Sequence, residues 1–81
     1  MEQIKNLILV IARALVDDPD QVRVNVVEGA SALIFEISVA KNDVGKIIGK
    51  QGRTANSLRL ILTAVGTKFG KRCTLEIMEQ V

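Results

Sequence analysis

The chain has 81 residues, 48% of them hydrophobic, and a formal net charge of +2, which is the composition of one small folded domain with a single two-layer core. It contains no His and only one cysteine, Cys73, so Ser/His and Cys/His nucleophiles are excluded and a zinc site would need mostly carboxylate ligands. We therefore expect no enzyme, no metal and no cofactor, a reducing compartment in which Cys73 stays unpaired, and no membrane span, because no apolar run approaches about 20 residues.

The first half of the chain predicts a helix followed by a strand hairpin. Apolar residues recur at helical spacing over residues 2–16, and the segment from Asp17 to Asp20 ends that helix because its proline disfavours helical backbone in the preceding residue. Alternating apolar residues predict strands over residues 21–28 and 32–39. The short Gly29-Ala30-Ser31 connection predicts that these two strands pair antiparallel.

The centre of the chain predicts two helices joined by a four-residue turn, Gly49-Lys50-Gln51-Gly52. Asn42 or Asp43 is placed to cap the short first helix, which ends at Ile48. Beyond the turn, apolar residues at helical spacing predict a second helix that Gly66 terminates as a C-cap. The two glycines allow close approach of another backbone, and the start of the second helix presents unpaired N–H groups and a positive dipole end that suit a phosphate.

A last predicted strand over residues 72–78 completes the order α-β-β-α-α-β. Such a chain is expected to fold as an α+β protein, in which a three-stranded sheet carries three helices packed on one face and leaves its other face polar. We expect residues 1–81 to form this single domain.

Charge is distributed unevenly along the sequence. Between Lys41 and Arg72 there are eight basic residues and one acid, a net charge of +7, whereas the remainder of the chain carries −5. Three of the basic residues, Lys46, Lys50 and Arg53, cluster around the glycine turn. This asymmetry indicates an anionic partner that binds near the turn.

The sequence Ile47-Ile48-Gly49-Lys50-Gln51-Gly52 resembles the signature of KH domains, in which an apolar-Ile-Gly-x-x-Gly turn clamps a nucleic-acid backbone. The element order is that of the KH type II variant, and the resemblance covers the whole chain. The opening Met-Glu-x-Ile-x-Asn-Leu-Ile, together with residues 43–54, is similar to the KhpA family of small stand-alone bacterial KH proteins. The chain departs from the commonest KH pattern at Ala55, where many KH domains carry Ile, which implies a shallower groove.

The resemblance implies binding of single-stranded RNA through the turn and an aliphatic groove, without enzymatic activity. The RNA-binding residues that it implies are Val44, Lys46, Ile48, Gly49, Lys50, Gln51, Gly52, Arg53 and Ala55. Lys46 and Arg53 would add positive charge beside the turn. Val44, Ile48 and Ala55 would line the groove for the bases.

The resemblance also implies a cellular role. Proteins of this family are cytoplasmic RNA chaperones that influence gene expression after transcription, with links to cell length and peptidoglycan homeostasis. They also pair with a larger KH-containing protein called KhpB or Jag.

The second predicted helix has more apolar surface than one core contact requires. Its main apolar stripe faces the sheet, whereas Leu60, Ile61 and Ala64 lie at the edge of that stripe or outside it. Two such helices packed across a twofold axis would bury these residues. We therefore expect a homodimer with Leu60, Ile61 and Ala64 at its interface, which would place two RNA grooves in one particle.

Two alternatives remain open from the sequence. A DNA-binding helix-turn-helix also joins two helices by a short turn, but its second helix presents polar side chains to the bases, whereas residues 58–62 are largely apolar. A dimerisation adaptor that binds no nucleic acid is the second alternative. A Walker nucleotide-binding loop is excluded, because Gly45 and Gly49 are one residue too close and Gln51 stands where Ser or Thr is required.

Overall fold

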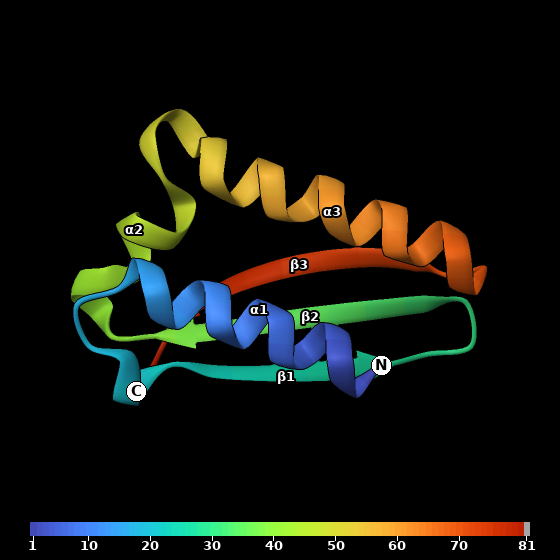
Figure 1. Cartoon of the computed structure of the whole chain (residues 1–81), viewed down its shortest axis with the longest axis horizontal. Coiled ribbons are helices and arrows are strands. Elements are labelled where there is room, and N and C mark those ends of the chain that lie inside the picture. Colours follow the sequence, from blue (N-terminus) through green and yellow to red (C-terminus); the bar gives the residue numbers. More distant parts are fainter. Residues whose placement is uncertain (81) are drawn as a thin grey trace.

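The computed structural model describes residues 1–80, which form three α-helices and three β-strands in the predicted order. The elements are α1 (Glu2–Leu15), β1 (Arg23–Glu28), β2 (Ala32–Val39), α2 (Val44–Ile48), α3 (Arg53–Phe69) and β3 (Arg72–Glu79). All three helices lie over one face of the sheet (Figure 1), so the predicted α+β architecture is confirmed. Within the described residues, each helix is too short or too polar to cross a bilayer.

The central strand of the sheet is β2. It pairs antiparallel with β1, so that Val24 lies opposite Ile37, and parallel with β3, so that Leu33 lies beside Cys73. The antiparallel hairpin confirms the prediction made from the short connection. The parallel pair requires a crossover connection, which α2, the glycine turn and α3 provide. As a result, α2 and the turn lie at the end of the sheet where β2 and β3 finish (Figure 1).

Apolar side chains from alternate strand positions meet the helices in one core. The buried residues of this core are Ile8, Ala12, Val22, Val24, Leu33, Phe35, Ile37, Val39, Ile47, Leu58, Leu62, Cys73 and Leu75. Burying an aliphatic or aromatic side chain of this kind stabilises the fold by roughly 1.5–3 kcal/mol. Because β2 buries every second residue, a shift of its register by one position would turn Phe35 and its neighbours towards water.

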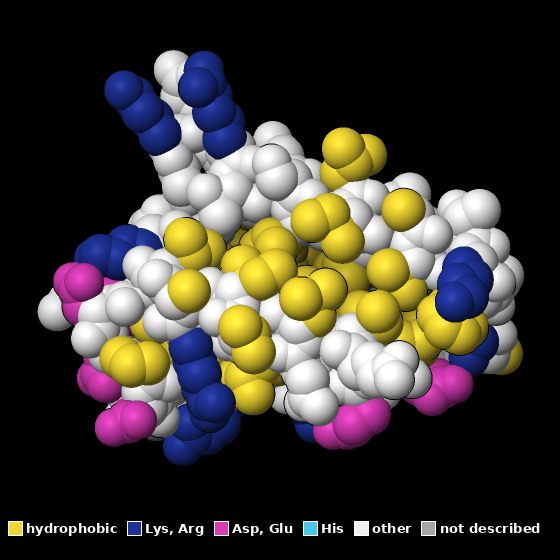
Figure 2. Space-filling model, viewed as in Figure 1, with side chains coloured by type: hydrophobic (Ala, Val, Ile, Leu, Met, Phe, Trp, Pro, Cys, Tyr) yellow, Lys and Arg dark blue, Asp and Glu magenta, His cyan; other side chains and the backbone are white. Residues whose placement is uncertain are grey.

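An apolar strip runs between α1 and α3 on the helical side of the molecule. Figure 2 shows hydrophobic side chains exposed along this side, over both helices. Two grooves, of about 480 Å³ and 340 Å³, lie along the strip. Ile4, Val65 and Phe69 line the first groove, Ile11, Leu15 and Leu58 line the second, and Ile61 lines both.

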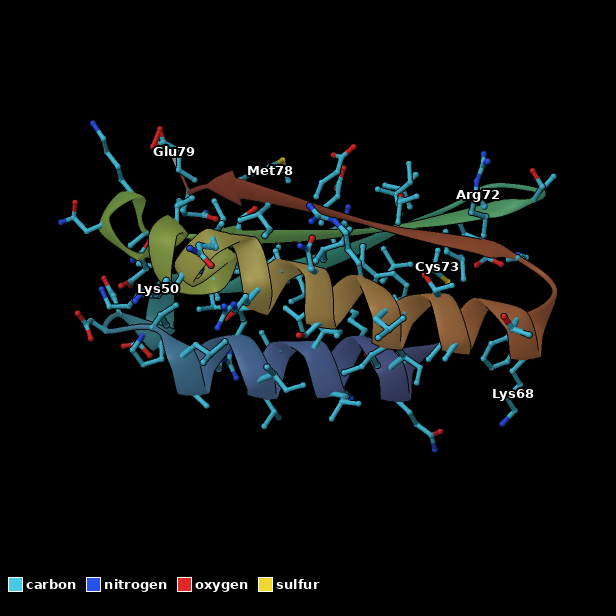
Figure 3. All side chains as sticks on the ribbon, turned by 90° about the horizontal axis from the view of Figure 1, so that it is seen from above. Lys50, Lys68, Arg72, Cys73, Met78 and Glu79 are labelled. Atoms are coloured by element: carbon cyan, nitrogen blue, oxygen red, sulfur yellow. The ribbon has the colours of Figure 1, made fainter. Side chains whose placement is uncertain are left out.

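The opposite face of the sheet is mostly polar, as predicted. Arg72 and Met78 project from this face, whereas Cys73 points towards α3 (Figure 3). Asn25 Nδ2 donates a hydrogen bond to Glu36 Oε1 (3.1 Å) across the β1–β2 pair. Cys73 is a buried core residue, and burial raises the pKa of its thiol.

The predicted C-cap at Gly66 is wrong. Helix α3 continues to Phe69 and ends at Gly70, whose φ of +69° is the left-handed conformation of a helix C-cap. Gly66 is instead a buried residue inside the helix, and a Cβ added there would overlap the carbonyl oxygen of Lys71 and lie 3.3 Å from the backbone nitrogen of Cys73. The glycine is therefore present because the start of β3 packs directly against the helix backbone.

The predicted cap of α2 is also wrong in its chemistry. Asp43 does occupy the N-cap position, but its side chain makes no capping hydrogen bond to α2. The carboxylate accepts hydrogen bonds from the backbone of Asp17 and Asp18 instead. A partner so distant in the sequence cannot be inferred from local spacing.

Candidate nucleic-acid interface

The turn between α2 and α3 is a compact loop that exposes Lys50 and Gln51. Gly49 N–H donates to Gly45 O (2.8 Å) at the end of α2, and Gly52 N–H donates to Gly49 O (3.0 Å) across the turn. Gly49, Gln51 and Gly52 have positive φ angles of +79°, +58° and +75°. Non-glycine residues rarely adopt this backbone, so the loop is a specific conformation rather than an unstructured linker.

The two glycines of the turn differ in how much space surrounds them. At Gly49, an added Cβ would overlap the Thr54 hydroxyl and lie 2.8 Å from the Thr54 backbone nitrogen. At Gly52, the nearest atom to an added Cβ is Asn56 Nδ2, at 3.8 Å. Packing within the turn therefore requires a glycine at Gly49, whereas the space around Gly52 is open.

The start of α3 has free capacity for an anion. Arg53 is the first residue of this 17-residue helix, and its own N–H donates to Lys50 O within the turn. No side chain caps the N–H groups that follow, because Gly52 occupies the N-cap position. Unpaired N–H groups and the positive end of the helix dipole both favour a negatively charged acceptor. A phosphate of a nucleic-acid strand has the required charge and oxygen atoms.

Lys50 and Arg53 are the cations of the turn. Both are exposed, and Figure 2 shows basic side chains projecting from the end of the molecule that carries the turn. Arg53 Nη2 donates a hydrogen bond to Gln51 Oε1 (3.3 Å), which holds the guanidinium beside the turn. The sequence has no Asp or Glu between Val44 and Leu75. No carboxylate of α2 or α3 therefore competes with a phosphate for the cations Lys50 and Arg53.

Lys46 lies apart from the other predicted RNA-binding residues. It and Ile48 are on opposite flanks of α2, one residue to either side of the buried Ile47. Lys46 Nζ pairs with Asp17 Oδ2 (3.3 Å) and Asp43 Oδ1 (3.5 Å). Hydrogen bonding to Asp17 is the main cause that raises the pKa of Lys46, and Asp43 adds to it. The structure therefore brings Lys46 to carboxylates near the end of α1.

Only two of the three residues predicted to line the aliphatic groove are accessible to solvent. Ile48 is 39% exposed and Val44 is half-buried, whereas Ala55 is only 2% exposed, beneath the start of α3. Ile48 and Val44 are therefore accessible to a ligand, whereas Ala55 is part of the packed interior. The aliphatic surface beside the turn is therefore small and centred on Ile48.

The three predicted interface residues are all exposed. Leu60 is 73% and Ile61 is 44% exposed, and Ala64 lies on the exposed side of the same helix. Helix α1 also contributes to this apolar surface, because Ile4 and Ile11 line the same strip as Ile61. These two residues were not predicted from the sequence to lie at the interface. The signal in the sequence was the large number of apolar residues in residues 2–16.

A polar pair near the turn, Arg59 and Asn56, is absent from the RNA-binding residues predicted from the sequence, where Arg59 was only counted as a basic residue. Arg59 Nη1 donates a hydrogen bond to Asn56 Oδ1 (3.2 Å), and both side chains are exposed within two helical turns of Gly52. Their spacing of three residues places them on one side of α3. This pair extends the basic surface from the turn along α3.

Together, the element order, the mixed sheet and the glycine turn between two helices define a KH domain of type II. Among solved structures, a similar fold occurs in Era, crystallised in complex with MgGDPNP and nucleotides 1506–1542 of 16S ribosomal RNA. The match has a TM-score of 0.56 at 18% identity, over 94% of this chain and 29% of the Era chain. The likeness at this identity concerns the fold alone.

The chain belongs to the KhpA/KhpB KH-domain family, whose model matches residues 5–77. The RNA-binding protein KhpA of Aquifex aeolicus is 48% identical, with 98% of this chain and 100% of that protein aligned. The KhpA proteins of Chlamydia pneumoniae and Clostridium acetobutylicum are each 46% identical over 94% and 91% of this chain, and over 97% and 99% of their own lengths. These relatives are named as RNA-binding proteins and not as enzymes, which confirms the family expected from the signature.

Proposed function

We propose that this protein binds single-stranded RNA, with phosphates at the glycine turn and bases against Ile48 and Val44. The observation that carries the proposal is the turn, which combines exposed Lys50 and Gln51 with an uncapped start of α3. Arg53 and the Arg59–Asn56 pair would add contacts to the strand. Membership of a family whose relatives are named as RNA-binding proteins supports RNA as the ligand.

A single strand fits the surface better than duplex DNA. A helix-turn-helix protein inserts its second helix into the major groove and needs hydrogen-bonding side chains on the exposed side of that helix. The exposed side of α3 has one polar pair near its start, Arg59 and Asn56, but it continues with the apolar residues Leu60, Ile61 and Ala64, which cannot read base edges in this way. A KH turn instead holds about four nucleotides of single strand.

We expect a short fluorescently labelled RNA to bind more tightly than a DNA duplex of the same sequence in an anisotropy titration. Its affinity should fall as salt rises, because each phosphate that is neutralised on a single strand releases roughly 0.7 counterions. Tighter binding to the duplex would favour a helix-turn-helix function. No binding to either nucleic acid would favour an adaptor.

We also propose that the protein forms a homodimer through the apolar strip. Leu60, Ile61 and Ala64 of α3 would meet the same residues of a second copy, and Ile4 and Ile11 of α1 would extend the contact. The exposure of Leu60 and Ile61 supports this interface, because large apolar patches rimmed by polar residues are typical of protein contacts. Two linked grooves would also raise the affinity for longer strands through effective concentration.

Ile61→Asp should convert this dimer to a folded monomer, because a carboxylate cannot be buried unpaired at the seam. Ile61 lines both grooves of the apolar strip but is 44% exposed in the single chain, so the fold should persist. Light scattering gives the mass, and circular dichroism checks folding. Thr74→Asp adds the same charge at an exposed position of β3, on the face of the sheet away from the helices, and should leave the dimer intact. A monomeric wild type, or an Ile61→Asp protein that remains dimeric, would exclude this interface.

The remaining family features are proposals of the same kind. We propose a cytoplasmic RNA chaperone that influences gene expression after transcription, with effects on cell length and peptidoglycan homeostasis. We further propose that it associates with a larger KH protein of the KhpB or Jag type, which the shared KhpA/KhpB family model supports. Affinity purification of the tagged protein from cells of its own organism, with and without RNase, separates a direct partner from an RNA-bridged one.

A further inference from the structure

The carboxylate of Asp43 connects two segments of the chain that are far apart in sequence. Its side chain is 2% exposed. Oδ1 accepts a hydrogen bond from the backbone N–H of Asp17 (3.1 Å), and Oδ2 accepts one from the backbone N–H of Asp18 (3.0 Å). Lys46 Nζ lies 3.5 Å from Oδ1 and completes the set of partners. The carboxylate therefore joins the start of α2 to the loop that follows α1.

This connection matters because α2 cannot hold its own position. It has five residues, far fewer than the roughly 12–15 that an isolated helix needs for marginal stability. Tertiary contacts must therefore fix it, and the buried side chains in and next to it are Ile47 and Asp43. The glycine turn begins directly after α2, at Gly49, so any movement of α2 is passed on to the turn.

We propose that Asp43 is a positioning residue for the glycine turn, which it holds in place through α2, and that Lys46 belongs to this connection and does not contact the bound strand. The proposal rests on the proposed binding of RNA at the turn. It differs from the assignment implied by the KH signature, in which Lys46 contributes charge to the RNA site. Asp17 and Asp43 neutralise that charge within the protein.

The ionisation of Asp43 agrees with this role. Burial of the carboxyl raises its pKa, but the two backbone hydrogen bonds and the Lys46 ammonium outweigh burial, and the pKa of Asp43 is lowered from its ordinary value. The group is therefore charged at neutral pH, and both of its oxygens are available as acceptors. An asparagine at this position would keep one acceptor but turn an NH₂ group towards the second backbone N–H.

Two variants test separately the hydrogen bonds of Asp43 and the ion pairs of Lys46. Asp43→Asn removes a charged acceptor from two backbone N–H groups, whereas Lys46→Gln removes only the ion pairs. We expect Asp43→Asn to weaken RNA binding about tenfold at a temperature where it is fully folded, because hydrogen bonds to a charged group are worth about that factor. We expect Lys46→Gln to bind within about twofold of the wild type, with an unchanged dependence on salt.

Amide hydrogen exchange in the absence of RNA provides the readout that distinguishes positioning from general stability. With Asp43→Asn, exchange at residues 44–52 should accelerate more than exchange in the central strand β2. If Asp43→Asn does not fold, Asp43→Ser replaces it, since a hydroxyl can reorient and presents no fixed NH₂ group. Equal acceleration in both regions, or RNA binding unchanged in the folded variant, would overturn the positioning role.

A further outcome concerns Lys46 alone. If Lys46→Gln weakens binding and lowers the salt slope by about 0.7, Lys46 contacts a phosphate and that part of the proposal is wrong. If the wild-type protein does not bind RNA, the proposed function fails, whereas the exchange experiment on the free protein still tests the connection between Asp43 and the turn.

Discussion

Replacement of both Lys50 and Gln51 by Asp should abolish RNA binding and leave the melting temperature nearly unchanged. The two side chains are exposed at the tip of the turn and contribute nothing to the core. Two carboxylates there would repel phosphates where the wild type presents a cation and an amide. Gln51 has a φ of +58°, a conformation that Asp adopts more readily than most residues, so the turn should keep its shape. An anisotropy titration with a short RNA measures the affinity, and thermal unfolding measures the stability.

A control must reproduce the change in net charge at a distant place. The pair Arg72→Glu and Thr74→Glu changes the net charge by the same amount, but both residues are exposed on the face of the sheet away from the helices. This control should lower the affinity only slightly, through the long-range field, and the effect should vanish at high salt. If the control loses as much affinity as the Lys50→Asp and Gln51→Asp protein, the turn is not the binding site.

Gly49→Ala should destabilise the protein far more than Gly52→Asn. At Gly49 the backbone has φ +79° and ψ 170°, which is essentially restricted to glycine, and the new Cβ would overlap the side chain of Thr54. We expect a loss on the order of 3 kcal/mol, which lowers the melting temperature of a domain of this size by about 12–24 °C. At Gly52 the backbone is left-handed, which Asn tolerates, and the space is open. The expected loss there is less than about 1 kcal/mol.

The Gly52→Asn protein also tests how closely RNA approaches the turn. Because the nearest atom to an added Cβ is 3.8 Å away, the new side chain would project into space that is empty in the free protein. A strand that packs against the turn backbone would occupy that space, so the variant should fold normally and bind RNA weakly. Wild-type affinity in a folded Gly52→Asn protein would contradict contact at Gly52. Equal melting temperatures for the two glycine variants would contradict the distinction between Gly49 and Gly52.

The order of the elements and the position of the turn could be predicted from the sequence, because both depend on neighbours close in the chain. Alternation of apolar residues identified which side of each strand is buried, and Phe35 lies in the core as that pattern predicts. Two glycines beside an isoleucine pair and basic residues identified the site between α2 and α3. The KH type II order followed from the succession of these local signals.

The contacts between distant segments could not be predicted from the sequence. The partner of Asp43 is a backbone 26 residues away, so no local pattern could reveal that this residue is tied to the loop after α1 instead of capping α2. Ion pairs with Asp17 and Asp43 hold Lys46 at the loop after α1, although its position in the sequence groups it with Lys50. Residue 66 is a glycine because β3 packs against the helix there, and the parallel β2–β3 pairing that brings β3 to this position joins segments far apart in the sequence. These features depend on packing between elements, which sequence spacing does not encode.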